Sequence, residues 1–368
     1  MVSRRAFVVS AAATVGGLAT LSFCSSRTGA ESYERAVRDT WRHGEAAVGD
    51  PTALARELVR HATLAPSSHN TQCWKFRVED RAIAILPDLA RRCPAVDPDD
   101  HHLFVSLGCA AENLIQAALA HGLQGQAVFD ATGGDALRIA LEPTKPVASP
   151  LFRAIPERRS TRSEYDGKAL SREELERLEQ AGTGEGVRVL LLTGRAAMER
   201  VLDYVVRGNT AQMNDPAFVE ELKAWIRFGG DEAARTGDGL YAASSGHPSL
   251  PSWLGSLLFG LFFTPASEND KHAKQVRSSA GIAVFVSDVA DKAQWVEVGR
   301  CYERFALQAA ASGIRNALLN QPVEVVTLRP QFAALLGVGD RRPDLVVRFG
   351  RGPALPRSLR RPVQAVLA

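Results

Sequence analysis

The stretch Leu107-Gly108-Cys109-Ala110-Ala111-Glu112-Asn113-Leu114 returns in altered form as Val298-Gly299-Arg300-Cys301-Tyr302-Glu303-Arg304-Phe305. Gly108 and Gly299 are 191 positions apart, and the same offset relates Glu112 to Glu303 and Gly122 to Gly313. In each copy apolar residues recur at helical spacing, small residues permit close packing, and a glycine follows where a left-handed cap ends a helix. We therefore expect two similar halves packed through two long core helices; a chance match of two small-residue helices is the alternative.

The sequence around these helices predicts an α+β fold. Residues 54–64 have a helical pattern, and Ser171 and Glu174 have capping-box spacing, so a second helix is expected up to about Ala181. Apolar or β-branched runs predict strands at 74–78, 82–86, 187–192, 282–286 and 345–349. Residues 132–150, rich in glycine and proline around one strand-like piece at 137–141, are expected to join the halves. The expected division is 31–145 for the first half and 146–368 for the second, with an insertion at about 208–274.

Composition sets broad limits on function. The chain has 368 residues, 45% of them hydrophobic, and a formal net charge of only +3. This is enough apolar material for a sizeable core, and the balance of charge excludes an overall polycation that coats nucleic acid. We expect no nucleic-acid partner.

The first 30 residues have the pattern of an export signal. Arg4-Arg5 precedes an apolar stretch at 8–23, the layout of a twin-arginine signal. The stretch is shorter than the roughly 20 residues that span a bilayer, so we expect cleavage, export through the twin-arginine machinery to the periplasm or cell envelope, and no stable membrane span afterwards. A membrane anchor and lipidation of Cys24 are the alternatives. This route suits proteins that fold around a cofactor before they cross.

Several common catalytic motifs are missing from the sequence. No C-x-x-C pair, H-E-x-x-H, G-x-S-x-G, Walker loop or G-x-G-x-x-G after a strand occurs. We therefore expect no metal site and no catalytic triad. Cys109 and Cys301 fall in apolar helical patterns and are interpreted as small core residues, although disulfides between the four later cysteines are possible in an exported protein.

Two polar clusters are the candidate functional segments. The stretch Ala65-Pro66-Ser67-Ser68-His69-Asn70-Thr71-Gln72-Cys73-Trp74 joins a predicted helix to a predicted strand. Arg158-Arg159-Ser160-Thr161-Arg162 gathers three guanidinium groups and two hydroxyls, a set that suits phosphate oxygens. Taken singly, the first is also explained as an ordinary polar turn and the second as a solvated basic loop.

Together, the A-P-S-S-x-N-x-Q-x-W turn, the R-R-S-x-R cluster and the long small-residue helix resemble the flavin-binding signatures of the nitroreductase family. The order of the motifs is similar to that of the Acg-type branch, in which one chain holds two nitroreductase-like halves. The resemblance spans about residue 50 to the C-terminus and implies a pseudo-dimer with FMN at the interface between the halves.

The resemblance also implies which residues hold FMN. Arg158, Ser160 and Arg162, with Arg159 beside them, would hold the phosphate and the pyrimidine edge. The opposite half would line the ring and ribityl chain through Pro66, Ser67, Ser68, Asn70 and Gln72. Asn320 and Gln321 occupy the place of a family Pro-x-Glu-Gly segment, from which they depart. Arg360 and Arg361 match late basic residues at the phosphate, with a solvated basic end as the alternative.

The implied function is an FMN-dependent oxidoreductase. A reduced donor, NAD(P)H in the family, would pass hydride to the flavin, which would pass electrons to a small acceptor, so no catalytic acid or base is expected. The apolar stretch 253–263 is expected to be a lid over the flavin or, alternatively, a helix packed on its own core or on a dimer partner. A closed lid leads to the alternative function, a protein that sequesters or stores flavin with little turnover. A binding module without flavin is a third possibility.

Overall fold

The structure is a computed structural model, and it describes residues 29–44 and 50–368. Most of the predicted export signal therefore lies outside the described residues. The first half is an antiparallel four-stranded sheet with the strand order β1-β2-β4-β3, accompanied by two helices. Its elements are α2 (Pro51–Thr63), η1 (Ser68–Asn70), β1 (Trp74–Glu79), β2 (Ala82–Pro87), η2 (Leu89–Arg91), α3 (His101–Ala120), β3 (Leu123–Asp130) and β4 (Ala136–Pro143).

The second half repeats this arrangement with the strand order β5-β8-β10-β9, again antiparallel. Each sheet receives its long helix between its second and third strands along the chain, α3 in the first half and α11 in the second. The elements of this framework are α4 (Pro150–Ala154), α5 (Arg172–Gly182), β5 (Val187–Leu192), β8 (Gly281–Ser287), α11 (Lys292–Ala311), β9 (Arg315–Leu318), α12 (Gln321–Glu324), α13 (Arg329–Leu336), β10 (Pro343–Gly350) and α14 (Val363–Val366). The predicted α+β class is confirmed.

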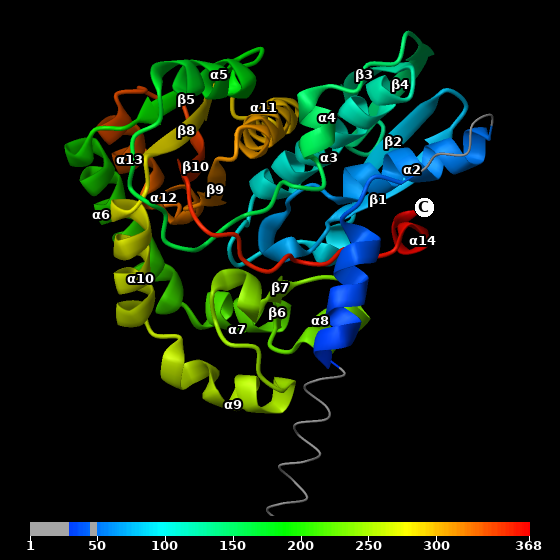
Figure 1. The fold of residues 1–368 in the computed structure, drawn as a ribbon. Coiled ribbons are helices and arrows are strands. Elements are labelled where there is room, and N and C mark those ends of the chain that lie inside the picture. Colours follow the sequence, from blue (N-terminus) through cyan, green and yellow to red (C-terminus); the bar gives the residue numbers. More distant parts are fainter. Residues whose placement is uncertain (1–28, 45–49) are drawn as a thin grey trace, which may run out of the picture.

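The two long helices cross at the equivalent glycines. A Cβ atom on Gly108 would lie 2.0 Å from the Val296 carbonyl oxygen, and one on Gly299 would lie 1.9 Å from the Val105 carbonyl oxygen. The contact is thus reciprocal, and only glycine fits on either side. Figure 1 shows α3 and α11 side by side between the two sheets.

A continuous hydrophobic core joins the two halves. It contains the inner faces of both sheets together with α3 and α11, for example Ile85, Leu114, Phe285 and Phe305. The outer face of the first sheet is open to solvent, and residues along β3 alternate between partly buried and exposed. The outer face of the second sheet is covered, because Val201 and Phe332 pack there with apolar residues of β8 and β10. Strands β8 and β10 are therefore buried throughout.

A large insertion lies between β5 and β8, where the first half has only the turn between β1 and β2. It starts before the expected residue 208, because α6 already begins at Arg195. Figure 1 shows α6 and α10 along one side of the second half and the remaining pieces below both halves. They are α6 (Arg195–Met213), α7 (Pro216–Trp225), β6 (Ile226–Arg227), α8 (Gly230–Thr236), β7 (Leu240–Tyr241), η3 (Ala242–Ser245), α9 (Ser252–Phe262) and α10 (Pro265–Arg277).

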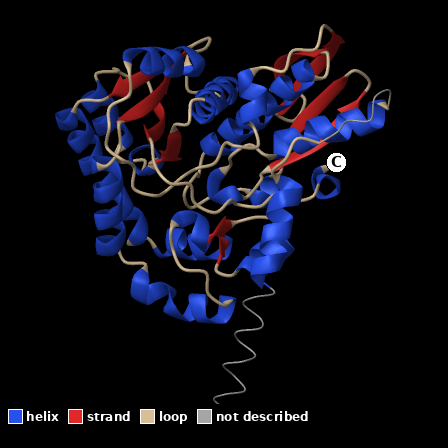
Figure 2. Ribbon diagram, in the orientation of Figure 1, coloured by secondary structure: helices blue, strands red, loops and turns tan. Residues whose placement is uncertain are grey.

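Two sequence interpretations need correction. Residues 137–141, expected in the passage between the halves, belong to β4, which lies inside the first sheet and pairs with both β2 and β3. The second concerns the apolar stretch 253–263, expected to be a lid or a helix packed on its own core or on a dimer partner: Trp253 and Leu257 on α9 are exposed and do not pack on the core, while Phe259 packs with Phe228 and Phe263. Figure 2 shows α9 as a peripheral helix.

Both ends of the described chain run along the first half. The helix at 29–40 places Tyr33 against Tyr241 and Leu359. After β10 the chain crosses back, and the Ala368 amide donates to the Phe76 carbonyl at 2.8 Å. Helix α3 is long and apolar enough to cross a membrane, but most of it is buried inside the protein. Cys73, Cys93, Cys109 and Cys301 are buried free thiols, which confirms the core interpretation of Cys109 and Cys301.

Candidate functional site

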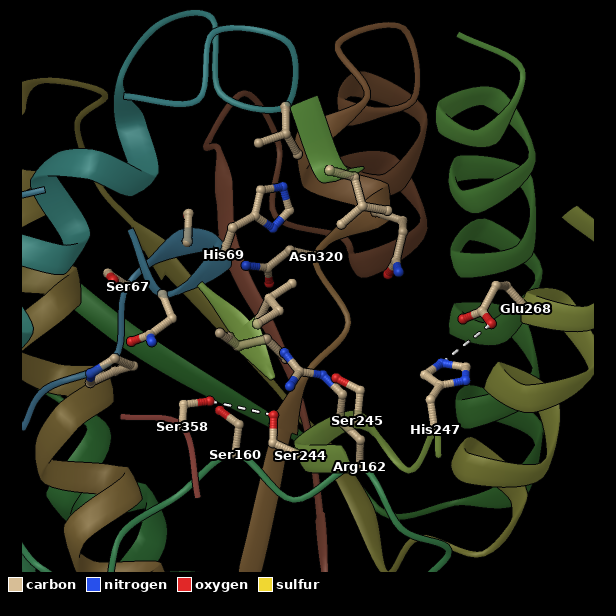
Figure 3. A pocket seen from close by; sticks show the side chains of 18 of the residues that line it. Ser67, His69, Ser160, Arg162, Ser244, Ser245, His247, Glu268, Asn320 and Ser358 are labelled. Atoms are coloured by element: carbon tan, nitrogen blue, oxygen red, sulfur yellow. Dashed lines mark hydrogen bonds and ion pairs between the residues drawn. The ribbon is translucent and has the colours of Figure 1, made fainter. Parts of the chain in front are cut away.

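A cavity of about 250 Å³ lies where the two halves meet the insertion. The turn after α2 forms one wall and the arginine segment forms another, so the structure brings the two predicted clusters together. The insertion supplies a third wall. Figure 3 shows side chains from all three parts around one space.

The turn after α2 has an unusual backbone. His69, Asn70 and Gln72 have φ values of 47°, 54° and 55°, in the left-handed region that histidine and asparagine visit more readily than most residues. The Ser67 hydroxyl accepts the Gln72 amide at 2.9 Å and holds the turn closed. As a result, Pro66, Ser67, Ser68 and His69 border the cavity.

The side chains of Asn70 and Gln72 hold this turn in place through hydrogen bonds to residues distant in the sequence. The Asn70 amide donates to the carbonyls of Gly239, at 2.9 Å, and Leu359, at 3.1 Å. Gln72 donates to the Gly237 carbonyl and accepts the Arg361 amide, both at 2.8 Å. These bonds tie the turn to the insertion and to the C-terminal segment. Asn70 still borders the cavity, whereas Gln72 is buried outside its lining.

Arg360 also has a scaffold role. Its guanidinium donates to the carbonyls of Thr63, Leu64 and Ala65 at the end of α2 and to the Asn70 side chain. A cation is favourable there because a helix ends with unsatisfied carbonyls and a partial negative charge. Burial, with the nearby Arg158, lowers the pKa of Arg360 to about 9. Arg360 borders the cavity, but Arg361 does not.

The arginine segment is pinned beside the second sheet. The Thr161 amide donates to the Asn316 carbonyl in β9 at 2.9 Å. The carbonyl of Arg162 accepts Gln275 at 2.7 Å, and the buried Arg348 donates to the carbonyls of Thr161 and Ser163. These contacts fix where the side chains of the segment emerge.

The three arginines of this segment have different environments. Arg158 is buried, with its Nε 3.1 Å from Glu303 Oε1 on α11, and it also donates to the Leu64 carbonyl at 2.8 Å. Arg159 donates to the Leu355 carbonyl at 2.9 Å. Arg162 points into the cavity, and within the described residues its guanidinium forms no hydrogen bond or ion pair (Figure 3). Arg162 and the neighbouring Ser160 are therefore the groups of this segment that remain free for a ligand.

The insertion contributes polar residues that the sequence did not single out. Lys271 Nζ lies 2.9 Å from His247 Nε2 and 3.5 Å from a Glu268 oxygen, and His247 lies 4.0 Å from Glu268 (Figure 3). Ser244 and Ser358 hydroxyls are 3.4 Å apart. No local motif marks these residues, because their contacts join segments that are distant in the sequence.

The second sheet places Asn320 and Gln321 at the cavity. Asn320 Oδ1 accepts the Val346 amide at 3.0 Å, which leaves its amide nitrogen for the cavity. Gln321 Nε2 lies 3.2 Å from His272 Nε2. Both residues thus lie where a ligand in the cavity would contact them.

The cavity carries positive charge. Burial lowers the pKa of His69, His247 and His272 to about 4 each, and the charge of Arg162 adds to this in all three cases. The three imidazoles are therefore neutral at neutral pH. The guanidinium of Arg162, which has no partner in the described part of the chain, lies with hydroxyl and amide donors in a buried setting, and this arrangement suits a small anionic ligand.

Of the 13 predicted cofactor-binding residues, the cavity lining contains all except Gln72 and Arg361. They are Pro66, Ser67, Ser68, Asn70, Arg158, Arg159, Ser160, Arg162, Asn320, Gln321 and Arg360.

Sequence comparison finds relatives in Mycobacterium tuberculosis. The chain is 24% identical over 327 residues to "Putative NAD(P)H nitroreductase Rv3131", which covers 85% of this chain and 90% of that protein. It is 23% identical over 329 residues to "Putative NAD(P)H nitroreductase acg", which covers 86% and 95% respectively. No family model matches the chain.

Solved structures of nitroreductases align with a little over half of the chain. A nitroreductase with bound FMN from Bacteroides fragilis is 15% identical, with a TM-score of 0.35, and the alignment covers 56% of this chain and 89% of that one. The FMN-dependent nitroreductase NfnB from Mycobacterium smegmatis, in complex with NADPH, is 14% identical, with a TM-score of 0.36 and coverage of 55% and 87%.

Proposed function

We propose that this chain is an FMN-dependent oxidoreductase of the nitroreductase type, which takes hydride from NAD(P)H and reduces a small acceptor. The observation that carries the proposal is the Arg162 guanidinium, which lies in a cavity between two equivalent halves and has no partner among residues 29–44 and 50–368. A phosphate monoester at this guanidinium would supply the charge that it lacks, and the Ser160 hydroxyl is close by in the same segment. The M. tuberculosis relatives, described as NAD(P)H nitroreductases, support the same assignment.

The chain's own residues divide into two groups toward FMN. Arg162, Ser160, Ser67, Asn320 and Gln321 offer side-chain groups to the ligand, whereas Arg158, Arg360, Asn70 and Gln72 hold the walls in place. When bound, FMN would supply the hydride-accepting centre, which an ordinary side chain cannot provide. The protein would orient the flavin, exclude water and hold its negative charge next to Arg162.

A second candidate is the flavin-sequestering protein, and the insertion residues beside the cavity together with its small volume favour it. Insertion residues such as Phe218, Leu240, His247 and Lys271 border the cavity. Its volume of about 250 Å³ lies below the ~300–1,000 Å³ of most small-molecule sites, so a bound flavin would leave little room for a nicotinamide. Of the described side chains in the stretch 253–263, only Phe263 borders the cavity, so the proposed cover consists of other parts of the insertion.

The first experiment measures FMN affinity by fluorescence quenching for the wild type, Arg162→Ala, Arg162→Lys and Arg172→Ala. Among the described residues Arg172 pairs only with Glu176, on the surface of α5, and it serves as the matched control. Loss of a charged hydrogen bond of ~1.5–3 kcal/mol predicts about 10- to 150-fold weaker binding for Arg162→Ala, with part of the affinity kept by the lysine. Equal affinity of all four proteins would reject the flavin site.

The second experiment separates the two functions. The FMN-loaded protein is mixed anaerobically with NADPH or NADH, and the flavin absorbance is followed in a stopped-flow instrument. Rapid bleaching followed by recovery on addition of a nitroaromatic or quinone acceptor supports the oxidoreductase. Tight FMN binding without reduction by the nicotinamides or by small artificial donors supports sequestration.

We also propose export by the twin-arginine route, on the basis of Arg4-Arg5 and the apolar stretch at 8–23. Cell fractionation of the wild type and of an Arg4→Lys/Arg5→Lys variant tests this. The wild type should reach the envelope in a shortened form, and the variant should stay in the cytoplasm at full length. A wild type that stays in the cytoplasm would rule out export.

A further inference from the structure

A group of metal-ligating side chains is buried at the start of α3, outside the lining of the cavity. Asp97, His101 and His102 each place one potential ligand atom within 4.8 Å of the others. Their exposed fractions are 3%, 0% and 4%. We propose that these three residues form a buried site for a divalent transition-metal ion such as Zn²⁺.

The hydrogen bonds of His102 define its tautomer. Its Nε2 lies 3.4 Å from the backbone carbonyl of Asp344, which can only accept a hydrogen bond. Nε2 therefore carries the hydrogen, and Nδ1 carries the lone pair. Within the described residues this buried Nδ1 has no hydrogen-bond partner.

His101 has the same arrangement toward the same residue. Its Nε2 lies 2.9 Å from Asp344 Oδ1, and the other oxygen of that carboxylate accepts the Ser287 amide at 2.7 Å. With Asp344 ionised, Nε2 donates and Nδ1 is left as a second buried lone pair that has no partner in the described part of the chain. Metal-bound histidines typically donate their other ring nitrogen to a carboxylate or a backbone carbonyl, and both kinds of acceptor are present here.

Asp97 supplies the anionic ligand. Its two oxygens accept the amides of His102, at 3.1 Å, and Leu103, at 2.9 Å, so the carboxylate is fixed at the start of the helix. Each oxygen keeps a further lone pair for a cation. A fourth ligand is also near, since Glu324 Oε1 lies 3.8 Å from His102 Nδ1.

The local charges favour a divalent cation. Asp97, Asp344 and the nearby Glu324 carry negative charge when ionised, and a doubly charged ion would offset most of it. The nearby Arg329 and Arg342 reduce this attraction, but both pair with Asp99, at 3.3 and 2.6 Å. Two imidazoles and a carboxylate suit Zn²⁺ and its neighbours in the first transition series better than Mg²⁺ or Ca²⁺.

The ion would connect the two halves of the molecule. Asp97, His101 and His102 come from the first half, whereas Glu324 on α12 and Asp344 on β10, the acceptor that orients both rings, belong to the second half. Binding of the metal ion would therefore stabilise the folded chain whether or not flavin is bound. This structural role of the metal site is separate from the proposed oxidoreductase function.

The test measures zinc in protein produced in zinc-supplemented medium and then dialysed against EDTA, by plasma mass spectrometry. We expect one zinc per chain in the wild type and loss of that zinc in His102→Gln. Glutamine keeps an amide where Nε2 donates to the Asp344 carbonyl, but it has no atom at Nδ1. His121→Gln is the matched control, because His121 lies at the other end of α3 and also has a buried ring nitrogen with no hydrogen-bond partner among the residues that the structure describes.

A second variant, Cys93→Ser, distinguishes the site from the grouping of His69, Cys93 and Glu221, whose ligand atoms also lie within 4.8 Å of one another. Zinc retained in Cys93→Ser supports the Asp97 site, and zinc lost in it assigns the metal to the other grouping and overturns the proposal. Absence of zinc from the wild type, or equal zinc in His102→Gln, overturns it as well.

If His102→Gln does not fold, the absorption spectrum of the Co²⁺-substituted wild type tests the proposed ligands instead. Ligand-field absorption in the visible without a thiolate-to-cobalt band in the near ultraviolet supports a site made of imidazole and carboxylate. A strong thiolate band, or no ligand-field absorption, overturns it. Zinc should also raise the unfolding temperature of the flavin-free wild type and of His121→Gln.

Discussion

Arg158 Nε lies 3.1 Å from Glu303 Oε1, and the two side chains are only 2% and 0% exposed. Glu303 is one of the residues repeated in the sequence, and Arg158 opens the arginine cluster. The pair therefore anchors the segment that carries Arg162 to the central helix α11. Arg158 therefore has a structural role, whereas Arg162 of the same motif points into the cavity.

Breaking this pair should destabilise the protein asymmetrically. Burial raises the pKa of Glu303 to about 7, so this carboxyl readily becomes neutral by taking up a proton when Arg158 is replaced. When Glu303 is replaced instead, the buried guanidinium keeps its charge, because arginine does not lose its proton in proteins. Glu303→Gln should cost ~3–5 kcal/mol of unfolding free energy, and Arg158→Met less than that. Urea unfolding of the flavin-free proteins measures both. The surface pair Arg172–Glu176 is the control, where Glu176→Gln should cost no more than ~1 kcal/mol.

The helix crossing should tolerate no side chain at its two glycines. Gly108→Ala or Gly299→Ala introduces a methyl group about 2 Å from a backbone oxygen, so the helices must separate. We expect the free energy of unfolding to fall by ~3 kcal/mol or more, or the variants to fail to fold, because two backbones in close contact cannot accommodate a methyl group without moving apart. Gly260→Ala on α9 is the control, since its Cβ would meet open space and should stabilise by up to ~1 kcal/mol. Thermal unfolding measures the stability of the three variants. Equal unfolding temperatures for Gly108→Ala, Gly299→Ala and Gly260→Ala would contradict the prediction.

Asn70 should hold the insertion against the first half. Asn70→Ala removes the bonds to the Gly239 and Leu359 carbonyls and the acceptor for Arg360, and it places alanine at a positive φ. Hydrogen exchange followed by mass spectrometry should show faster exchange at residues 237–247 and 357–361. Peptides from β2 should exchange as in the wild type. Unchanged exchange at 237–247 would mean that other contacts suffice to dock the insertion.

His61 should make the protein less stable in acid. Burial, assisted by Arg60 and His43 and opposed by Glu57, lowers the pKa of His61 to about 4, whereas an unfolded chain has about 6.5. The unfolded state binds more protons between these values, so this contribution is present above pH 6.5 and is lost as the pH falls to 4. The loss is up to ~3 kcal/mol at ~1.4 kcal/mol per pKa unit.

A His61→Gln variant isolates that contribution. Glu303 and Asp344, with pKa values raised to about 7 by burial, act in the opposite direction, but they are the same in both proteins. The free energy of unfolding between pH 7.5 and 4.5 should therefore fall less steeply in the variant than in the wild type. Parallel curves would show that His61 does not remain neutral in the folded protein.

Much of the framework was predictable because its signals are local or repeated. The duplicated helices, the strands β1, β2, β5, β8 and β10 and the capping box of α5 all follow from spacing within a few residues. β3 was missed because its alternating pattern includes Gly125 and two glutamines, which weaken the signal of a strand. β9 has only four residues, and the helices of the insertion pack on a sheet whose position the sequence does not reveal.

The site was predictable as a set of segments, but not residue by residue. The sequence brought out the turn and the arginine cluster because their residue types suit phosphate and amide chemistry. It could not show that Arg158, Arg360, Asn70 and Gln72 bind other parts of the chain, because their partners are a glutamate and backbone carbonyls more than 90 positions away. His247 and Lys271 were missed for the same reason.

The position of Arg360 has a consequence for synthesis of the chain. The turn at 66–72 is translated early, yet carbonyls at the end of α2 and the Asn70 side chain receive their donors from residue 360. A ribosome-bound polypeptide that lacks this arginine holds the turn with those groups exposed to water or to chaperones. The pocket is thus assembled only after residue 360 has been translated, which delays ligand capture until both lobes exist.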